Sequence, residues 1–164
     1  MFGLFRSKKK DKIAEQQDFV TTTAKSLFSQ IEQARDEAKA GGIVDEKVFN
    51  ERLNNMYVAG YLVGFVDSHI ANITEDDAAK REYAENIFNT MFPGVGTDFI
   101  KERLAIRTRA KNLATDDSKY AEVAAQCHAF DTGMADAEEE VEKVRETSEY
   151  NQEKLKKFLL LGEI

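Results

Sequence analysis

The sequence predicts an all-α fold, a helical bundle of about five helices in one domain. One proline and nine glycines among 164 residues give too few turn signals for many short strands. Apolar residues recur at steps of three and four along most of the chain, the spacing of one helix face. With 42% hydrophobic and 32% charged residues, the composition is that of a globular domain. A chain of this length buries a core without metals or disulfides.

The first long helix is predicted over residues 12–40. Its apolar positions follow the helical spacing: Ile13, Val20, Ala24, Leu27, Ile31, Ala34 and Ala38. Gly41 and Gly42 end it, because glycine adopts the left-handed conformation that terminates helices. We expect residues 1–11 to form a separate basic and apolar tail, and residues 12–164 to form the single helical domain.

The second long helix is predicted over residues 46–72, with Asp45 as its N-cap. It is apolar on all sides between Tyr57 and Val66, which predicts a position at the centre of the fold. Gly60 and Gly64 lie one turn apart, where missing side chains let a neighbouring backbone approach. The longest apolar run, residues 56–66, is well short of the roughly 20 residues that span a bilayer.

A shorter helical hairpin is predicted over residues 75–92 and 98–114, with a break at Pro93 and Gly94. The third long helix is predicted over residues 117–160. Two heptad series, which start at Tyr120 and Val123, continue through it at alternating steps of three and four. One unbroken helix of about 45 residues would be roughly 65–70 Å long, with Gly133 as its expected kink.

Such a rod is longer than the helices predicted to cover it. We therefore expect the heptad helix to extend beyond its own bundle, or to form a coiled coil with a protein partner or a second copy of the chain. The residues predicted for this association surface are Val141, Val144, Leu155, Phe158 and Leu159.

Charge is divided unevenly along the chain. Residues 1–12 carry five cations and one acid, a sum of +4, which leaves −11 for the remainder of a chain whose total is −7. An acidic body repels phosphate backbones, so we predict no nucleic-acid partner. The N-terminal residues instead suit an anionic membrane surface: Phe2, Leu4, Phe5, Arg6, Lys8, Lys9 and Lys10. The alternatives are a frayed tail, or one that lies on the acidic body.

Catalysis and cofactor binding have little support in the residue pattern. His69, Cys127 and His128 are the only imidazoles and thiol, and their spacing is not that of a zinc site. No serine or cysteine is paired with a recognisable base, so we predict no metal and no cofactor, and a non-enzymatic role is favoured over catalysis by residues that converge from distant positions. The lone thiol and the lack of a signal-peptide core favour the cytoplasm, with or without membrane association.

The favoured function is therefore that of a non-enzymatic interaction or adaptor protein. It would associate through the long last helix and attach peripherally to a membrane through its N-terminus. The alternative is a small-ligand-binding or enzymatic helical domain with a pocket beside the second helix. The residues predicted to line that pocket are Tyr57, Tyr61, Phe65 and His69.

Overall fold

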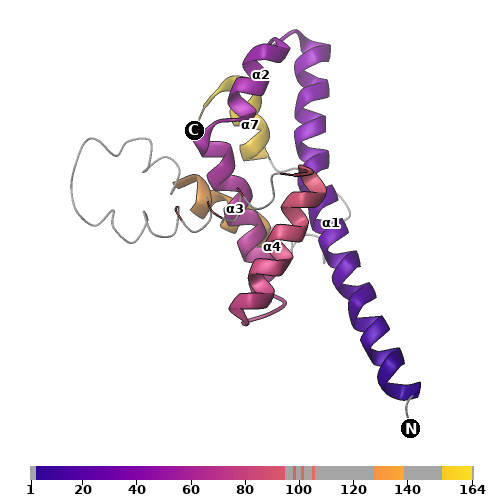
Figure 1. The fold of residues 1–164 in the computed structure, drawn as a ribbon. Helices are drawn as coiled ribbons and strands as arrows, with labels where there is room; N and C mark the ends of the chain where they lie inside the picture. The colour runs from indigo at the N-terminus through magenta and orange to yellow at the C-terminus, as the bar shows by residue number, and fades with distance from the viewer. Residues whose placement is uncertain are drawn as a thin grey trace, which may run out of the picture.

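In a computed structural model, the parts of the chain that are described comprise residues 3–94, 98, 101, 105, 128–138 and 153–163. Within these ranges the secondary structure is helical and includes no strand, which confirms the all-α bundle (Figure 1). The central helix, α3, packs against α1, α4 and the helical segment 128–138. Of those described, no helix is both long and apolar enough to cross a bilayer.

Helix α1 spans Gly3–Gly41 and is much longer than the prediction of 12–40 at its N-terminal end. Its C-terminal end matches, since Gly42 takes the predicted left-handed conformation with a φ of 57°. The predicted apolar face is buried from Val20 to Ala38, and Leu27 and Ala34 have no exposed surface. The segment predicted as a separate tail is therefore the first part of this helix.

The single helix predicted over 46–72 is wrong, because the structure divides it into α2 (Glu46–Leu53) and α3 (Met56–Ala71). Asn54 caps the C-terminus of α2, and the Oδ1 atom of Asn55 accepts a hydrogen bond of 2.8 Å from the backbone N–H of Tyr57. Asparagine side chains compete with helical hydrogen bonds, so two in a row favour this break. Asp45 caps α2 as predicted.

Helix α4 spans Asp77–Met91, close to the predicted 75–92, and Asp76 caps it by accepting a hydrogen bond from the N–H of Ala79. It packs along α1, where Phe19 and Tyr83 meet edge to face with ring centroids 5.5 Å apart. The predicted partner helix, 98–114, lies outside the described residues except at 98, 101 and 105.

Helix α3 and segment 128–138 cross at two glycines. A Cβ atom on Gly64 would overlap the carbonyl oxygen of Phe130, and one on Gly133 would overlap the carbonyl oxygen of Tyr61. The two backbones are therefore in direct contact and run in opposite directions. This close approach at Gly64 agrees with the sequence prediction, whereas Gly133, expected as a kink, is a contact point.

The predicted continuous helix over 117–160 is wrong. Helix α7 (Glu153–Leu161) and segment 128–138 are both helical, but the Nζ atom of Lys154 lies 2.7 Å from the Oδ1 atom of Asp136. In one straight helix these residues would be about 27 Å apart, at 1.5 Å per residue. The two helical segments are therefore neighbours in the bundle and not parts of one rod.

Helix α7 covers the core on the side of α1 and α2. It buries Leu155, Phe158, Leu159 and Leu160, each contributing about 1.5–3 kcal/mol. The Nη1 atom of Arg52 donates hydrogen bonds to the backbone carbonyls of Leu159 and Leu160, which lie at the C-terminus of α7. A cation at that end of a helix also meets the negative end of the helix dipole.

We expect Gly64→Ala to lower the free energy of unfolding by about 1–3 kcal/mol, because the added methyl group forces α3 and segment 128–138 apart. Urea unfolding followed by circular dichroism measures the loss. Gly41→Ala is the matched control. Its added Cβ would meet only the side chain of Ile43, which is 53% exposed and can move away. Equal losses in both variants would contradict the close crossing.

Candidate functional site

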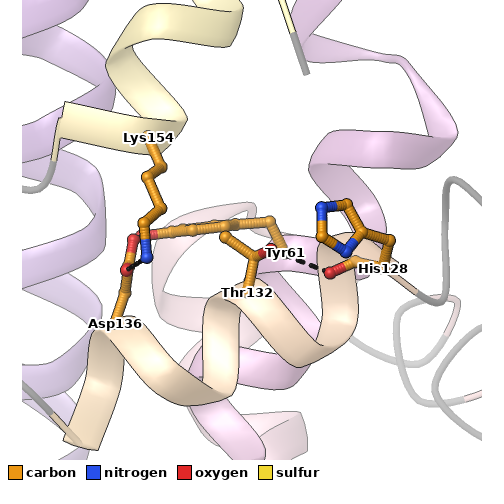
Figure 2. A network of polar contacts seen from close by, with 5 residues as sticks. All are labelled: Tyr61, His128, Thr132, Asp136 and Lys154. Atoms are coloured by element: carbon orange, nitrogen blue, oxygen red, sulfur yellow. Dashed lines mark hydrogen bonds and ion pairs between the residues drawn. The ribbon is translucent and has the colours of Figure 1, made fainter.

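A buried polar cluster lies where α3, segment 128–138 and α7 meet. Its central group is the carboxylate of Asp136, whose side chain is 2% exposed. The Oη atom of Tyr61 donates to Oδ2 at 2.9 Å, and Nζ of Lys154 donates to Oδ1 at 2.7 Å. Figure 2 shows Lys154 reaching Asp136 from α7, with Thr132 one turn earlier on the same helix as Asp136. The carboxylate therefore joins three elements.

Tyr57 belongs to the same cluster and precedes Tyr61 by one helical turn. Burial raises the pKa of Tyr57 above its usual 10.0, and the negative charge of Asp136 adds to that rise. The Lys154 ammonium and a hydrogen bond with Thr132 act in the opposite direction. The Tyr57 ring also packs against Phe158 of α7, with ring centroids 4.5 Å apart. Helix α7 therefore contacts this cluster through Phe158 as well as through Lys154.

The geometry of this cluster indicates a structural role, in which polar contacts hold three elements together. A folded protein is strongly destabilised when one partner of a buried ion pair is removed, because the remaining buried charge is left without compensation. The ammonium of Lys154 arrives from a side chain that is 55% exposed, while Asp136 is enclosed. The cluster therefore fixes α7 and segment 128–138 against α3.

The residues predicted to line a ligand pocket are part of the core. Tyr57, Tyr61 and Phe65 are 5%, 0% and 0% exposed, and Phe65 contacts the half-buried His69 with ring centroids 4.7 Å apart. The Tyr61 and Phe65 rings stack on each other, and the Tyr57 ring packs against Phe158 of α7. The structure therefore uses the rings of these three residues to fill the core.

The predicted association surface divides into two parts. Leu155, Phe158 and Leu159 are buried within their own chain, so they do not form an exposed surface here. In α7 these residues pack against α1 and α2, and the Phe158 ring packs against Tyr57 of α3. Val141 and Val144 lie outside the described residues.

The candidate metal ligands are likewise only partly described. Cys127 lies outside the described residues, whereas His128 is exposed and His69 is half-buried in α3. Among the residues that the structure does describe, no three His, Cys, Asp or Glu side chains are grouped as a metal site.

The second candidate site is the N-terminal arm, which we define as residues 3–13 of α1. These residues are helical, and Figure 1 shows the first turns of α1 extending past the other helices. Ala14, Glu15, Gln17 and Asp18 are exposed, Gln16 and Phe19 are partly buried, and the first buried residue among those described on α1 is Val20. The described contacts of α1 with α4 begin beyond the arm, with the hydrogen bond from Gln16 to Glu82 and the ring contact between Phe19 and Tyr83.

The arm carries Arg6, Lys8, Lys9, Lys10 and Lys12 against Asp11. The structure thus brings together, on one helical extension, all the predicted membrane-contact residues except Phe2, which lies outside the described residues. Fold and site define a small acidic helical bundle with a projecting basic helical arm. Comparisons with protein-family models, with curated proteins and with solved structures find no match for this chain.

The role of Asp136 is not predicted by the sequence pattern. This residue stands at the start of an acidic run and resembles one more solvated charge, yet it is 1% exposed. Its position three residues after Gly133 was the available signal, since a helix that meets another at a glycine buries the residues one turn away.

We expect Tyr61→Phe to lower the free energy of unfolding by about 1.5–3 kcal/mol, because it removes a donor to a buried carboxylate. Chemical denaturation measures the change. Tyr83→Phe is the control, since Tyr83 is half-buried on α4 and keeps its ring contact with Phe19. Equal losses of stability in both variants would contradict the stabilising role of the buried cluster.

A second prediction concerns pH. Because the pKa of Tyr57 is raised in the folded chain, the unfolded chain loses this proton first as the pH passes 10.0. The stability that Tyr57 contributes is complete below pH 10 and falls above it. Unfolding free energies between pH 9 and 11 should therefore decline more steeply for the wild type than for Tyr57→Phe. Parallel declines would contradict the shifted pKa.

Proposed function

We propose that this protein is a non-enzymatic interaction protein that attaches to an anionic membrane surface through the N-terminal arm. Its acidic bundle would then be presented to protein partners. The observation that carries the proposal is the projection of a basic, partly apolar helical segment beyond the core that anchors α1.

The composition of the arm supports a lipid surface as its ligand. Each Lys or Arg near an anionic surface contributes about 1 kcal/mol, so a net charge of +4 contributes roughly 4 kcal/mol. Leu4 and Phe5 stand beside these cations and supply apolar groups for the interface between headgroups and acyl chains. This combination distinguishes a membrane surface from nucleic acid, which offers charge without an apolar layer.

The continuity of α1 supports the same proposal. The arm is helical from Gly3 onward and leads directly into the turns buried at Val20 and Leu27. A helix that continues straight from the core cannot also fold back over the acidic bundle. This direction supports attachment to an external surface over neutralisation of the arm by its own chain.

The acidic bundle supports the second half of the proposal. The chain outside residues 1–12 carries a net charge of −11, which favours basic surfaces on protein partners and keeps the bundle away from anionic lipid. We place the attachment at the cytoplasmic face of a membrane, where anionic lipids are concentrated and a lone thiol stays reduced.

Sedimentation with vesicles of phosphatidylcholine and phosphatidylserine tests the attachment. The wild-type chain should bind these vesicles at 0.1 M salt and should be released at 0.5 M, because screening weakens surface charge interactions. Replacing Lys8, Lys9 and Lys10 with Gln removes three of the five cations. We expect this variant to bind about 100-fold more weakly, since about 3 kcal/mol of attraction is removed.

The matched control replaces Lys25, Lys39 and Lys47, all exposed on the bundle, with Gln. It lowers the net charge by the same amount but should retain the wild-type vesicle affinity within a few-fold. Equal losses in the two triple variants would show that net charge and not the arm controls binding. If the intact chain ignores the vesicles but binds an RNA oligonucleotide through Lys8, Lys9 and Lys10, the membrane proposal is overturned.

A further inference from the structure

A second line of regularly spaced residues runs along α1, on a side that the core does not use. We call it the outer stripe, and its members recur at steps of three, four or seven: Ala14, Asp18, Thr21, Lys25, Phe28, Glu32 and Lys39. All of them are exposed or half-buried, whereas Leu27 and Ile31 of the same helix are buried. This spacing is that of a heptad face, along which helices pack against one another.

The charges of the outer stripe alternate in sign once every seven residues. Asp18 and Glu32 are negative, whereas Lys25 and Lys39 are positive. Phe28 lies at the middle of this series, and it is 45% exposed although it is a large apolar side chain. Four charges of alternating sign around a central exposed ring complement a copy of the same surface that runs in the opposite direction.

From this pattern we infer that the outer stripe is the contact surface of a homodimer, in which the α1 helices of two copies pack antiparallel with Phe28 beside the two-fold axis. In that register Asp18 of each copy faces Lys39 of the other, and Lys25 faces Glu32. The two-fold symmetry forms each pair twice, as in any isologous interface. The contact surface lies outside the N-terminal arm, so the dimer does not rest on the proposed attachment to lipid.

The alternating charges select this register over its neighbours. An antiparallel pair shifted by one heptad in either direction places Lys25 opposite a lysine, either Lys25 or Lys39 of the other copy. Parallel helices in register place every charge opposite its own copy. Parallel helices staggered by seven residues pair opposite charges, but they leave free ends to which further copies add, so they do not close as a dimer. Facing like charges disfavour the alternative registers, as charged flanking positions do in coiled coils.

The contacts that α1 makes within its own chain lie outside the outer stripe. The residues of α1 that make the described polar and ring contacts with α2, α4 and α7 are Gln16, Phe19, Arg35 and Glu37. In Figure 1 the other labelled helices lie to the left of α1. In the proposed register, residues 16–41 of the two copies overlap over about 39 Å, at 1.5 Å per residue. Because most of this contact is polar, we expect a reversible dimer at the weak end of specific interfaces.

Sedimentation equilibrium of the full chain tests the dimer at about 0.1 M salt, where surface charges are only partly screened. Asp18 and Lys39 are reversed because both are exposed, whereas Glu32 already pairs with Arg35 of its own helix. Asp18→Lys and Lys39→Glu should each weaken dimerisation by about 10-fold, since either change turns two attractive contacts into repulsive ones. An equimolar mixture of the two variants should recover the wild-type affinity within a few-fold, because each reversed charge then faces an opposite one.

Arg81→Glu is the matched control, because Arg81 is exposed on α4 and its reversal changes the net charge by the same amount as Lys39→Glu. This variant should dimerise like the wild type. Recovery in the mixture would also exclude misfolding as the cause of the weaker binding. The dimer is overturned if the wild-type chain stays monomeric at millimolar concentration. The antiparallel register is overturned if both reversals leave a dimer intact, if the mixture restores nothing, or if the control loses as much as Lys39→Glu.

Discussion

The backbone contact between α3 and segment 128–138 determines much of the remaining structure. At Gly64 and Gly133 there is no room for a Cβ atom, so the two helices approach as closely as their main chains allow. Glycine in a helix costs about 1 kcal/mol relative to alanine. The close packing at this crossing offsets that cost. The same contact sets the rotation of segment 128–138 and therefore the direction in which Asp136 points.

A buried carboxylate follows from that crossing, and it constrains the C-terminal end of the chain. Asp136 requires compensation where it is buried, which Tyr61 and Lys154 provide. Lys154 belongs to α7, so α7 is held over the core by both a polar contact and its apolar side chains. Arg52 holds the opposite end of α7 by donating hydrogen bonds to the backbone carbonyls of Leu159 and Leu160. Polar and apolar contacts thus select the same position for this helix.

The helix that extends beyond the rest of the bundle differs from the one that the sequence predicted. The heptad pattern of the last third predicted that a helix over residues 117–160 would extend beyond the bundle. In the structure, α7 packs into the bundle through Leu155 and Leu159. The helix that exceeds its neighbours is α1, and its excess is basic. The proposed attachment surface therefore lies on α1, whereas the heptad pattern had predicted it on the last helix.

What the sequence by itself determined is local in origin. Helical spacing fixed the buried face of α1, Gly42 fixed its end, and Asp45 fixed the start of α2, because each depends on residues within one or two turns. Asn54 and Asn55 carried a local signal as well, and the apolar spacing around them concealed it. The tertiary structure alone decided the burial of Asp136 and the pairing of α7 with segment 128–138. Both depend on contacts between residues far apart in the chain, and a heptad pattern is the same whether its partner is another molecule or the same chain.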